Sequence, residues 1–200
     1  MGLREKKKDR RKKKIYESAL KLFLEFGYEK TTMEMIAGDA ELGVGTLYNY
    51  YSSKHDIFFS IIEISSEKYV GQFDEVIGNC ETLADSIYRF IDIYMECFSV
   101  YGKRIWRELF GEILLRDHKL AENIDILDED FLNKIRELLI GFRSKGVFKQ
   151  DINIDVTAST LYSLLGYNLI RYVNDNEMSE KELINTLKSQ VKLVIDAIIK

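Results

Sequence analysis

The sequence contains no proline, two cysteines and two histidines. Cys80 and Cys97 are far apart and form no CxxC pair, so neither a disulfide framework nor a zinc site is expected, and a reducing cytoplasm fits this usage best. No apolar run approaches the roughly 18 residues needed to cross a bilayer, and no apolar segment closely follows the basic N-terminus, so we expect no secretory signal. HExxH, GxSxG, P-loop and GxGxxG motifs are also missing.

The two histidines offer little for catalysis or metal binding. His55 lies at the expected start of a helix, and no Ser or Cys nucleophile stands at a readable spacing from His118. Asp117, His118 and Glu122 form a grouping of metal-ligand residue types, but mixed charges in a loop are mostly solvated. We therefore predict no metal, no cofactor and no enzymatic activity.

The same absences favour an all-α fold. There is no proline, and most of the 12 glycines stand where helices would end. Helical periodicity is present, whereas alternating strand patterns and Asn-Gly or Asp-Gly hairpin signals are absent. The first helix is predicted from about Asp9 to Phe26, after a mobile tail at residues 1–8. A later helix of about 25 residues is predicted from Ser53.

A domain boundary is predicted inside that long helix, because no Gly/Ser-rich or Pro-rich linker interrupts the chain. Residues 1–60 then form one domain and residues 61–200 a second. In the second domain, Ser179 with Glu182 forms a clear capping box, and Asp155 is predicted to cap the preceding helix. A charged break is predicted at residues 116–130.

Charge is distributed unevenly between these two parts. Residues 1–60 carry 12 Lys and Arg against 9 Asp and Glu, whereas residues 61–200 carry 17 against 24. Such asymmetry is expected when only one end of a protein meets a polyanion. The basic tail, Lys6 to Lys14, either follows a nucleic-acid backbone, enters an adjacent minor groove, or solubilises the chain.

The stretch from Thr31 to Asp56 indicates two short helices joined by a tight turn and followed by the capped start of a third. Thr31 with Glu34 forms a capping-box pattern, and the second short helix is predicted from about Val44 to Tyr50. This helix crowds small, hydroxyl and aromatic side chains onto one exposed turn. That arrangement is typical of a helix-turn-helix that lies in the major groove of DNA.

Residues 12–62 resemble the DNA-binding domain of TetR-family transcriptional regulators. The likeness lies in ALKLFLEFGYEKTTMEMIA at 19–37 and in GTLYNYYSSKHDIF at 45–58. The remainder matches only in length and helical character. The resemblance implies a homodimer of all-helical subunits. Each subunit would carry an N-terminal helix-turn-helix and a C-terminal domain that binds a small effector and dimerises.

The resemblance also implies a set of contacts with double-stranded operator DNA. The residues that align with the family's recognition helix are Val44, Gly45, Thr46, Tyr48, Asn49 and Tyr50. Gly45 would let the helix backbone approach the DNA, and Asn49 can read adenine if it points into the groove. Thr32, at the amino end of the preceding helix, suits a phosphate, and Lys54 matches the family's phosphate lysine. Leu47 is expected to pack inside the domain instead.

The turn itself departs from the family pattern. Ala-Gly-Val-Ser is usual there, and this chain has Ala40-Glu41-Leu42-Gly43. The usual glycine tolerates a left-handed backbone, so Glu41 must bear a modest strain or adopt a different turn. Gly43 lacks the usual capping hydroxyl, at a cost of about a few tenths of a kcal/mol.

The second domain is expected to hold the effector and the dimer contact. Its dense aromatic residues serve either as ordinary core or as walls of a pocket for an aromatic or lipid-like molecule. The candidate pocket residues are Tyr94, Phe98, Trp106, Phe110, Tyr162 and Tyr167. Apolar stripes on the last two helices predict a four-helix bundle between two subunits, although part of each stripe must pack within one subunit.

These patterns predict a DNA-binding transcriptional regulator, in its simplest form a repressor that a small-molecule effector releases from its operator. Two other interpretations stay open. The first is a helical lipid- or small-molecule-handling protein, or an enzyme, that does not bind DNA. The second is a protein that uses its basic first helix on a membrane surface, although no membrane partner is expected.

Overall fold

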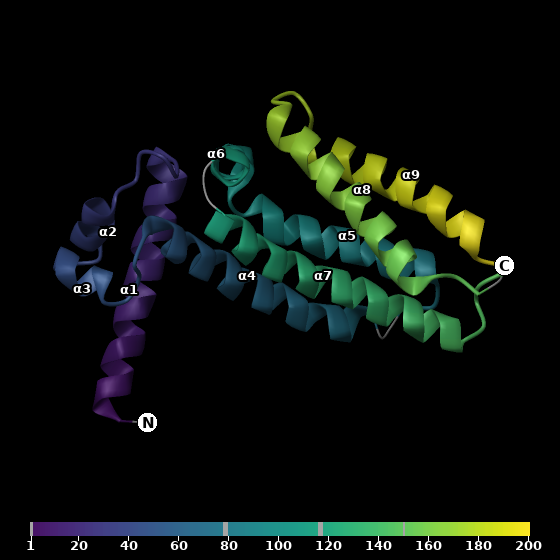
Figure 1. Ribbon diagram of the computed structural model, residues 1–200, viewed down its shortest axis with the longest axis horizontal. Coiled ribbons are helices and arrows are strands. Elements are labelled where there is room, and N and C mark those ends of the chain that lie inside the picture. The colour runs from purple at the N-terminus through teal and green to yellow at the C-terminus, as the bar shows by residue number, and fades with distance from the viewer. Residues whose placement is uncertain (1, 78–79, 116–117, 150) are drawn as a thin grey trace. The chain divides into compact units, whose positions relative to one another are not determined.

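The computed structural model describes residues 2–77, 80–115, 118–149 and 151–200, with side chains except at 3–4, 65–72, 74–77, 109, 112–115 and 118–128. Within these residues the chain is helical and contains no strand, which confirms the all-α prediction. The helices are α1 (Leu3–Phe26), α2 (Met33–Asp39), α3 (Val44–Tyr48), α4 (Lys54–Ile77), α5 (Leu83–Ser99), α6 (Gly102–Leu115), α7 (His118–Ser144), α8 (Ile154–Asn174) and α9 (Glu180–Ile198) (Figure 1).

The first helix begins six residues earlier than predicted, at Leu3 rather than Asp9. Residues 3–8 were expected to be a mobile tail because they have too few apolar side chains to pack. Lys, Arg and Glu are nevertheless good helix formers, and the backbone N–H of Gly2 donates to Glu5 Oε2 at 2.9 Å at the start of the helix. The basic stretch is therefore a helical extension of α1.

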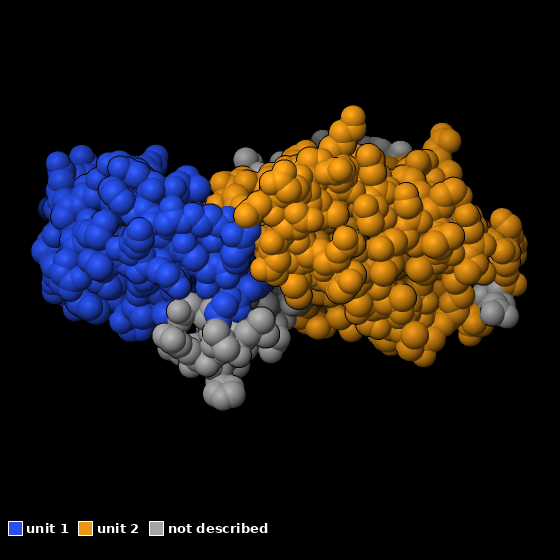
Figure 2. Space-filling view, turned by 90° about the horizontal axis from the view of Figure 1, so that it is seen from above, with its two compact units in different colours: residues 1–65, 104–123 blue, residues 66–103, 124–200 orange. Residues whose placement is uncertain are grey.

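The chain divides into two compact units, which Figure 2 colours separately. Unit 1 comprises residues 1–65 and 104–123, and unit 2 comprises residues 66–103 and 124–200. The division falls inside α4, the long helix where the sequence predicted a boundary. Residues 104–123, which the sequence analysis assigned to the second domain, group with the first unit instead. Both α4 and α6 therefore contribute residues to both units.

The core of unit 1 is an aromatic cluster from α1, α4 and α6. The rings of Phe23, Tyr28 and Phe58 lie 5.3–5.5 Å apart, centre to centre, and all three side chains are almost completely buried. Trp106 meets Phe58 edge to face at 6.4 Å. Such ring pairs contribute about 0.5–1.5 kcal/mol each beyond their buried area. These ring contacts hold α1 against α4, and α4 against α6, and the helix-turn-helix lies between α1 and α4 in the chain.

Unit 2 is a bundle in which α9 packs against both α5 and α8. The buried side of α9 consists of Leu183, Leu187, Val191 and Ile195, and that of α8 includes Leu161, Leu165 and Leu169. A second aromatic cluster lies in this unit, where Phe73 stacks on Phe90 at 4.8 Å. Much of the apolar stripe on the last two helices is thus buried within one subunit.

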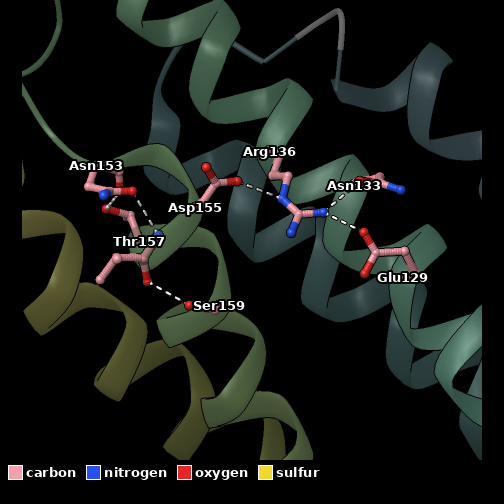
Figure 3. A network of polar contacts seen from close by, with 8 residues as sticks. Glu129, Asn133, Arg136, Asn153, Asp155, Thr157 and Ser159 are labelled. Atoms are coloured by element: carbon pink, nitrogen blue, oxygen red, sulfur yellow. Dashed lines mark hydrogen bonds and ion pairs between the residues drawn. The ribbon is translucent and has the colours of Figure 1, made fainter.

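A polar network joins α7 to the start of α8 (Figure 3). The Arg136 guanidinium donates to Glu129 at 2.7 Å, to Asn133 at 2.6 Å and to Asp155 at 3.0 Å. Asp155 is therefore an ion-pair partner. The cap that was predicted for it comes from Asn153, whose side-chain oxygen accepts from Val156 N–H at 3.1 Å. Asn153 was missed because an Asn two residues before an Asp competes for the same capping role.

Two other features of the second unit test the sequence predictions. The capping box at the start of α9 is confirmed, because Ser179 accepts from Glu182 N–H and Glu182 accepts from Ser179 N–H. The predicted charged break at 116–130 is wrong over most of its length, since α7 begins at His118. That stretch contains no proline or glycine, and its Leu, Ala, Glu and Lys residues favour a helix.

Neither cysteine forms a disulfide. Burial raises the pKa of the Cys97 thiol to about 11, so this group stays protonated at neutral pH. Among the described residues, no helix is both long enough and apolar enough to span a bilayer.

Candidate nucleic-acid interface

The turn between α2 and α3 is closed by two backbone hydrogen bonds. Leu42 N–H donates to Ala37 C=O at 2.9 Å, and Glu41 N–H donates to Gly38 C=O at 3.1 Å. This pairing is the Schellman motif, which ends a helix on a left-handed residue. Glu41 occupies that position with φ of 56°. Of the two predicted possibilities, a strained left-handed backbone at Glu41 or a different turn, the chain adopts the left-handed backbone.

The N-termini of α2 and α3 are capped in different ways. Gly43 is the N-cap of α3 and supplies no side-chain hydrogen bond, as its sequence predicts. Thr32 rather than Thr31 caps α2, and its hydroxyl accepts from Met35 N–H at 3.2 Å. Thr31 is buried and donates to the carbonyls of Gly27 and Leu22. Thr31 thus binds carbonyl groups at the end of α1, and Thr32 caps the start of α2.

The short helix α3 turns one face inward and another outward. Leu47 is completely buried, which confirms its predicted packing role. Tyr48 is 49% exposed, and Asn49 and Gly45 are also exposed. Val44, Thr46 and Tyr50 are half-buried. A Cβ atom built at Gly45 would meet nothing within 4 Å, so packing inside the chain does not require a glycine there.

Two ion pairs fasten α1 to the helix-turn-helix. Lys14 Nζ lies 2.5 Å from Glu41 in the turn, and Lys21 Nζ lies 2.6 Å from Asp39 at the end of α2. Hydrogen bonds from Lys21 and Ser18 hold the pKa of the Asp39 carboxyl below its usual value. The hydrogen bond from Lys14 lowers the pKa of Glu41 in the same way. Both contacts fix the turn that orients α3.

The loop between α1 and α2 is held by charged side chains from two other helices. Lys54, at the start of α4, donates to the carbonyl oxygens of Tyr28 at 2.7 Å and Glu29 at 3.2 Å. Arg104 in α6 donates to Phe26 C=O at 2.5 Å. Its neighbour Glu108 accepts from Glu29 N–H at 3.1 Å. The ammonium of Lys54, predicted to contact phosphate, is thus engaged by the protein's own backbone.

Gly27 is favoured at this junction by its backbone conformation, and the end of the Arg104 side chain lies close to it. The φ of 90° at Gly27 lies in the region that side chains rarely adopt. The Arg104 guanidinium also occupies the space that a Cβ atom would fill. The first helix was predicted to end at Phe26, directly before Gly27, but the approach of Arg104 depends on a contact 78 residues away in the chain.

The six candidate effector residues are divided between the units. Trp106 and Phe110 belong to unit 1, with ring centres 5.8 Å apart. Tyr94 and Phe98 belong to unit 2, where Tyr94 meets Phe131 edge to face at 4.9 Å. Tyr162, on α8, is half-buried. The side chains of His118 and Glu122, and the whole of Asp117, lie outside the described residues.

Tyr167 occupies a different environment from the other five. It is 61% exposed on α8, on the side away from the buried leucines. The neighbouring outward residues include Val156 at 59% exposed and Ile170 at 50%, and Leu193 on α9 is 74% exposed. Tyr167 is therefore a surface residue of α8 in the single chain.

Comparison with known proteins identifies the arrangement of the first three helices. The sequence model of the family described as "Bacterial regulatory proteins, tetR family" matches residues 15–61, which extend from the middle of α1 into α4. Residues 15–61 therefore match a TetR-family DNA-binding domain. The match includes the α2–α3 turn and every residue of the predicted recognition helix, so Glu41 and Gly43 are variations within a TetR-family domain.

Individual TetR-family relatives extend the comparison. The uncharacterized HTH-type transcriptional regulator YhgD of Bacillus subtilis is 31% identical over 86 residues, or 43% of this chain and 45% of that protein. The chain thus aligns with less than half the length of this curated relative. A putative TetR-family regulator from Mesorhizobium loti shares the fold over 96% of this chain, with a TM-score of 0.75 and 19% identity. Thermus thermophilus FadR, solved with lauroyl-CoA, matches over 94% with a TM-score of 0.73 and 20% identity.

Proposed function

We propose that this chain is a DNA-binding transcriptional regulator that acts in the cytoplasm and inserts α3 into the major groove. The observation that carries the proposal is the outward face of α3, beside a fully buried Leu47 in a TetR-family domain. Polar and aromatic side chains gather there, and Tyr48 and Asn49 are exposed. The empty space beside Gly45 further supports close approach of a partner to the helix.

Each outward residue fits one kind of contact. Tyr48 and Tyr50 have phenol hydroxyls that can donate to phosphate oxygens, which positions the protein on the duplex. Thr46 suits a phosphate or a thymine methyl group, and Asn49 suits the paired donor and acceptor of adenine. Thr32 can bring its hydroxyl to a phosphate while it caps α2. Lys54 is better assigned to holding the α1–α2 loop than to the DNA.

The regulator is proposed to act as a homodimer through α8 and α9. The exposed apolar residues Val156, Tyr167, Ile170 and Leu193 support this surface. Two copies of each helix would form a four-helix bundle. A two-fold dimer would present two α3 helices, which must lie about 34–36 Å apart to enter successive major grooves.

A small apolar effector is proposed to bind in unit 2, near Tyr94 and Phe98. The aromatic interior of that unit supports an aromatic or acyl-type ligand. Acyl-CoA is the first class to try, because the structurally similar Thermus thermophilus FadR was solved with lauroyl-CoA. An effector that prefers one spacing of the two α3 helices would shift the population away from DNA. Repression with release by the effector is therefore the proposed mode.

The helices α4 and α6 are the proposed route of this coupling. Each contributes residues to both units, and each holds the α1–α2 loop through a charged side chain, Lys54 or Arg104. A small change in either helix would therefore move the loop that precedes α2. The effector is expected to weaken DNA binding while the dimer stays intact.

Footprinting on the DNA upstream of the protein's own gene tests the proposal. We expect a protected site, and we expect Tyr48→Ala to weaken binding about tenfold or more, which equals about 1.4 kcal/mol. Tyr88→Ala, in α5, is the matched control and should bind normally. A chain that ignores every duplex at low salt would support a helical lipid-handling protein or enzyme, and binding to anionic liposomes alone would support a membrane-surface role.

A further inference from the structure

The basic extension of α1 borders a groove that it shares with the recognition helix. The groove has a volume of about 820 Å³. On the α1 side it is lined by Lys7, Lys8, Arg11 and Lys12, together with one carboxylate, Glu5. On the other side it is lined by Thr46, Asn49 and Tyr50. All of these residues belong to unit 1, and the groove contains a clear excess of positive charge.

The cations of α1 are divided between two faces of the helix. Residues 7, 8, 11 and 12 share one face, since positions three and four apart in a helix are neighbours. Lys6, Arg10 and Lys13 follow the same spacing on the opposite face, and none of them lines the groove. The carboxylate in the groove, Glu5, already accepts from the Gly2 N–H. The groove face is therefore positioned to attract an anion beside α3, and the opposite face is not.

The shape of duplex DNA identifies an occupant for this groove. The major groove is about 12 Å wide and is walled on both sides by phosphate strands. A helix that lies in it therefore has a phosphate strand alongside. The cationic side chains of α1 line the same groove as Thr46, Asn49 and Tyr50. A partner that fills this groove touches the recognition helix and the four cations together.

We propose that Lys7, Lys8, Arg11 and Lys12 form a second DNA-contact surface, which binds phosphates of the strand that borders α3. The inference rests on the proposed function of α3 and adds a role for the helical extension. Phosphate contacts carry no base information directly. The surface therefore raises affinity for operator and random duplex alike, and it sets the salt dependence of binding.

Two triple variants of equal charge test this surface. The groove variant is Lys8→Gln/Arg11→Gln/Lys12→Gln, and the control is Lys6→Gln/Arg10→Gln/Lys13→Gln. Each removes three positive charges from exposed positions of the same helix. Circular dichroism and thermal unfolding of the full chain establish that both variants fold. Affinity is then measured for a random duplex and for the footprinted DNA from about 50 to 200 mM salt.

The expected results differ between the two variants. The slope of log K against log salt is negative, and each lost phosphate contact reduces its magnitude by about 0.9. The groove variant should therefore lose about two to three units of slope on both DNAs, and the control should lose less than one. The ratio of operator to random affinity should stay the same for both.

Several outcomes would overturn the inference. Equal losses in the two variants would mean that total charge matters and position does not. A groove variant that keeps the wild-type slope but loses binding to anionic vesicles would assign this face to a membrane surface. A wild-type protein that binds no duplex would instead contradict the proposed function of α3, so the two failures are distinguishable.

Discussion

The ammonium group of Lys54 lies 2.7 Å from the carbonyl oxygen of Tyr28 and 4.4 Å from the centre of that residue's ring. One side chain at the start of α4 thus binds both the backbone and the aromatic face of Tyr28, in the loop after α1. A lysine at a helix N-terminus opposes the helix dipole by a few tenths of a kcal/mol. The carbonyl oxygens of Tyr28 and Glu29 offset that cost within the chain itself.

Replacement of Lys54 by Met is expected to destabilise the first unit. The variant loses two charge-assisted hydrogen bonds and a cation–π contact, and partial exposure limits the expected loss to about 1–2 kcal/mol. Chemical denaturation measures it. Lys30→Met, at an exposed lysine of the same loop, is the control and should change stability little. Unchanged stability of Lys54→Met, with the salt slope of DNA binding reduced by about one, would restore Lys54 as a phosphate contact.

The sequence predicted the parts of this domain that depend on neighbours in the chain. Leu47 was predicted to be buried because Tyr51 stands one turn later, and Ser179 with Glu182 was predicted to cap α9 because the two positions interact directly. The usual sequence of the resembled family indicated that Glu41 would either adopt a left-handed backbone or lie in a different turn. The inferences for Leu47 and for Ser179 with Glu182 needed only residues within about one helical turn, whereas the inference for Glu41 came from the family resemblance.

Contacts between distant segments could not be predicted in this way. No local pattern connects Arg104 to the carbonyl of Phe26, or Lys54 to that of Tyr28, because packing of whole helices creates both contacts. The groove between α1 and α3 was missed for a related reason. Lys7 and Lys8 on its α1 side were expected to lie in a mobile tail, and a tail has no defined faces.

Asp39 is expected to make the stability of unit 1 depend on pH. Its folded pKa lies below the ordinary 3.8, because Lys21 and Ser18 hydrogen bond to the ionised carboxylate. A lowered pKa means that its stabilisation is complete above the unfolded pKa and disappears as pH falls through the folded pKa. Asp39→Asn should therefore be less stable than the wild type at pH 6–7, and the gap should close below about pH 4.

Urea denaturation of both proteins between those pH values measures that gap. The comparison cancels the contributions of Glu41 and Glu182, whose pKa values are also lowered. A difference that stays constant down to about pH 3 would mean that the Asp39 carboxylate is not stabilised in the folded state.

Replacement of Glu41 by glycine should leave the protein more stable than replacement by alanine. Both substitutions remove the ion pair with Lys14, so their difference isolates the cost of the left-handed backbone at φ of 56°. Glycine adopts this conformation without the steric cost of a Cβ atom. Glu41→Gly should be more stable than Glu41→Ala by about 1 kcal/mol in thermal or chemical unfolding. Equal stabilities would show that the turn relaxes when the side chain is shortened.

The outward face of α8 and α9 should control the oligomeric state. Leu193→Glu places a charge on a residue that is 74% exposed in the single chain, so the folded subunit should tolerate it. In a dimer that buries this face, the same charge would be desolvated without a partner, at a cost of several kcal/mol. Sedimentation velocity should therefore show a monomer for Leu193→Glu where the wild type is a dimer.

Ile140→Glu is the matched control for this substitution. Ile140 is 55% exposed and lies on α7, which is not one of the two proposed contact helices. The control should remain a dimer, and its operator affinity should match that of the wild type. Leu193→Glu should lose operator affinity because a monomer offers only one α3 helix to the DNA. If Ile140→Glu dissociated the protein and Leu193→Glu did not, the dimer contact would have to include α7 instead.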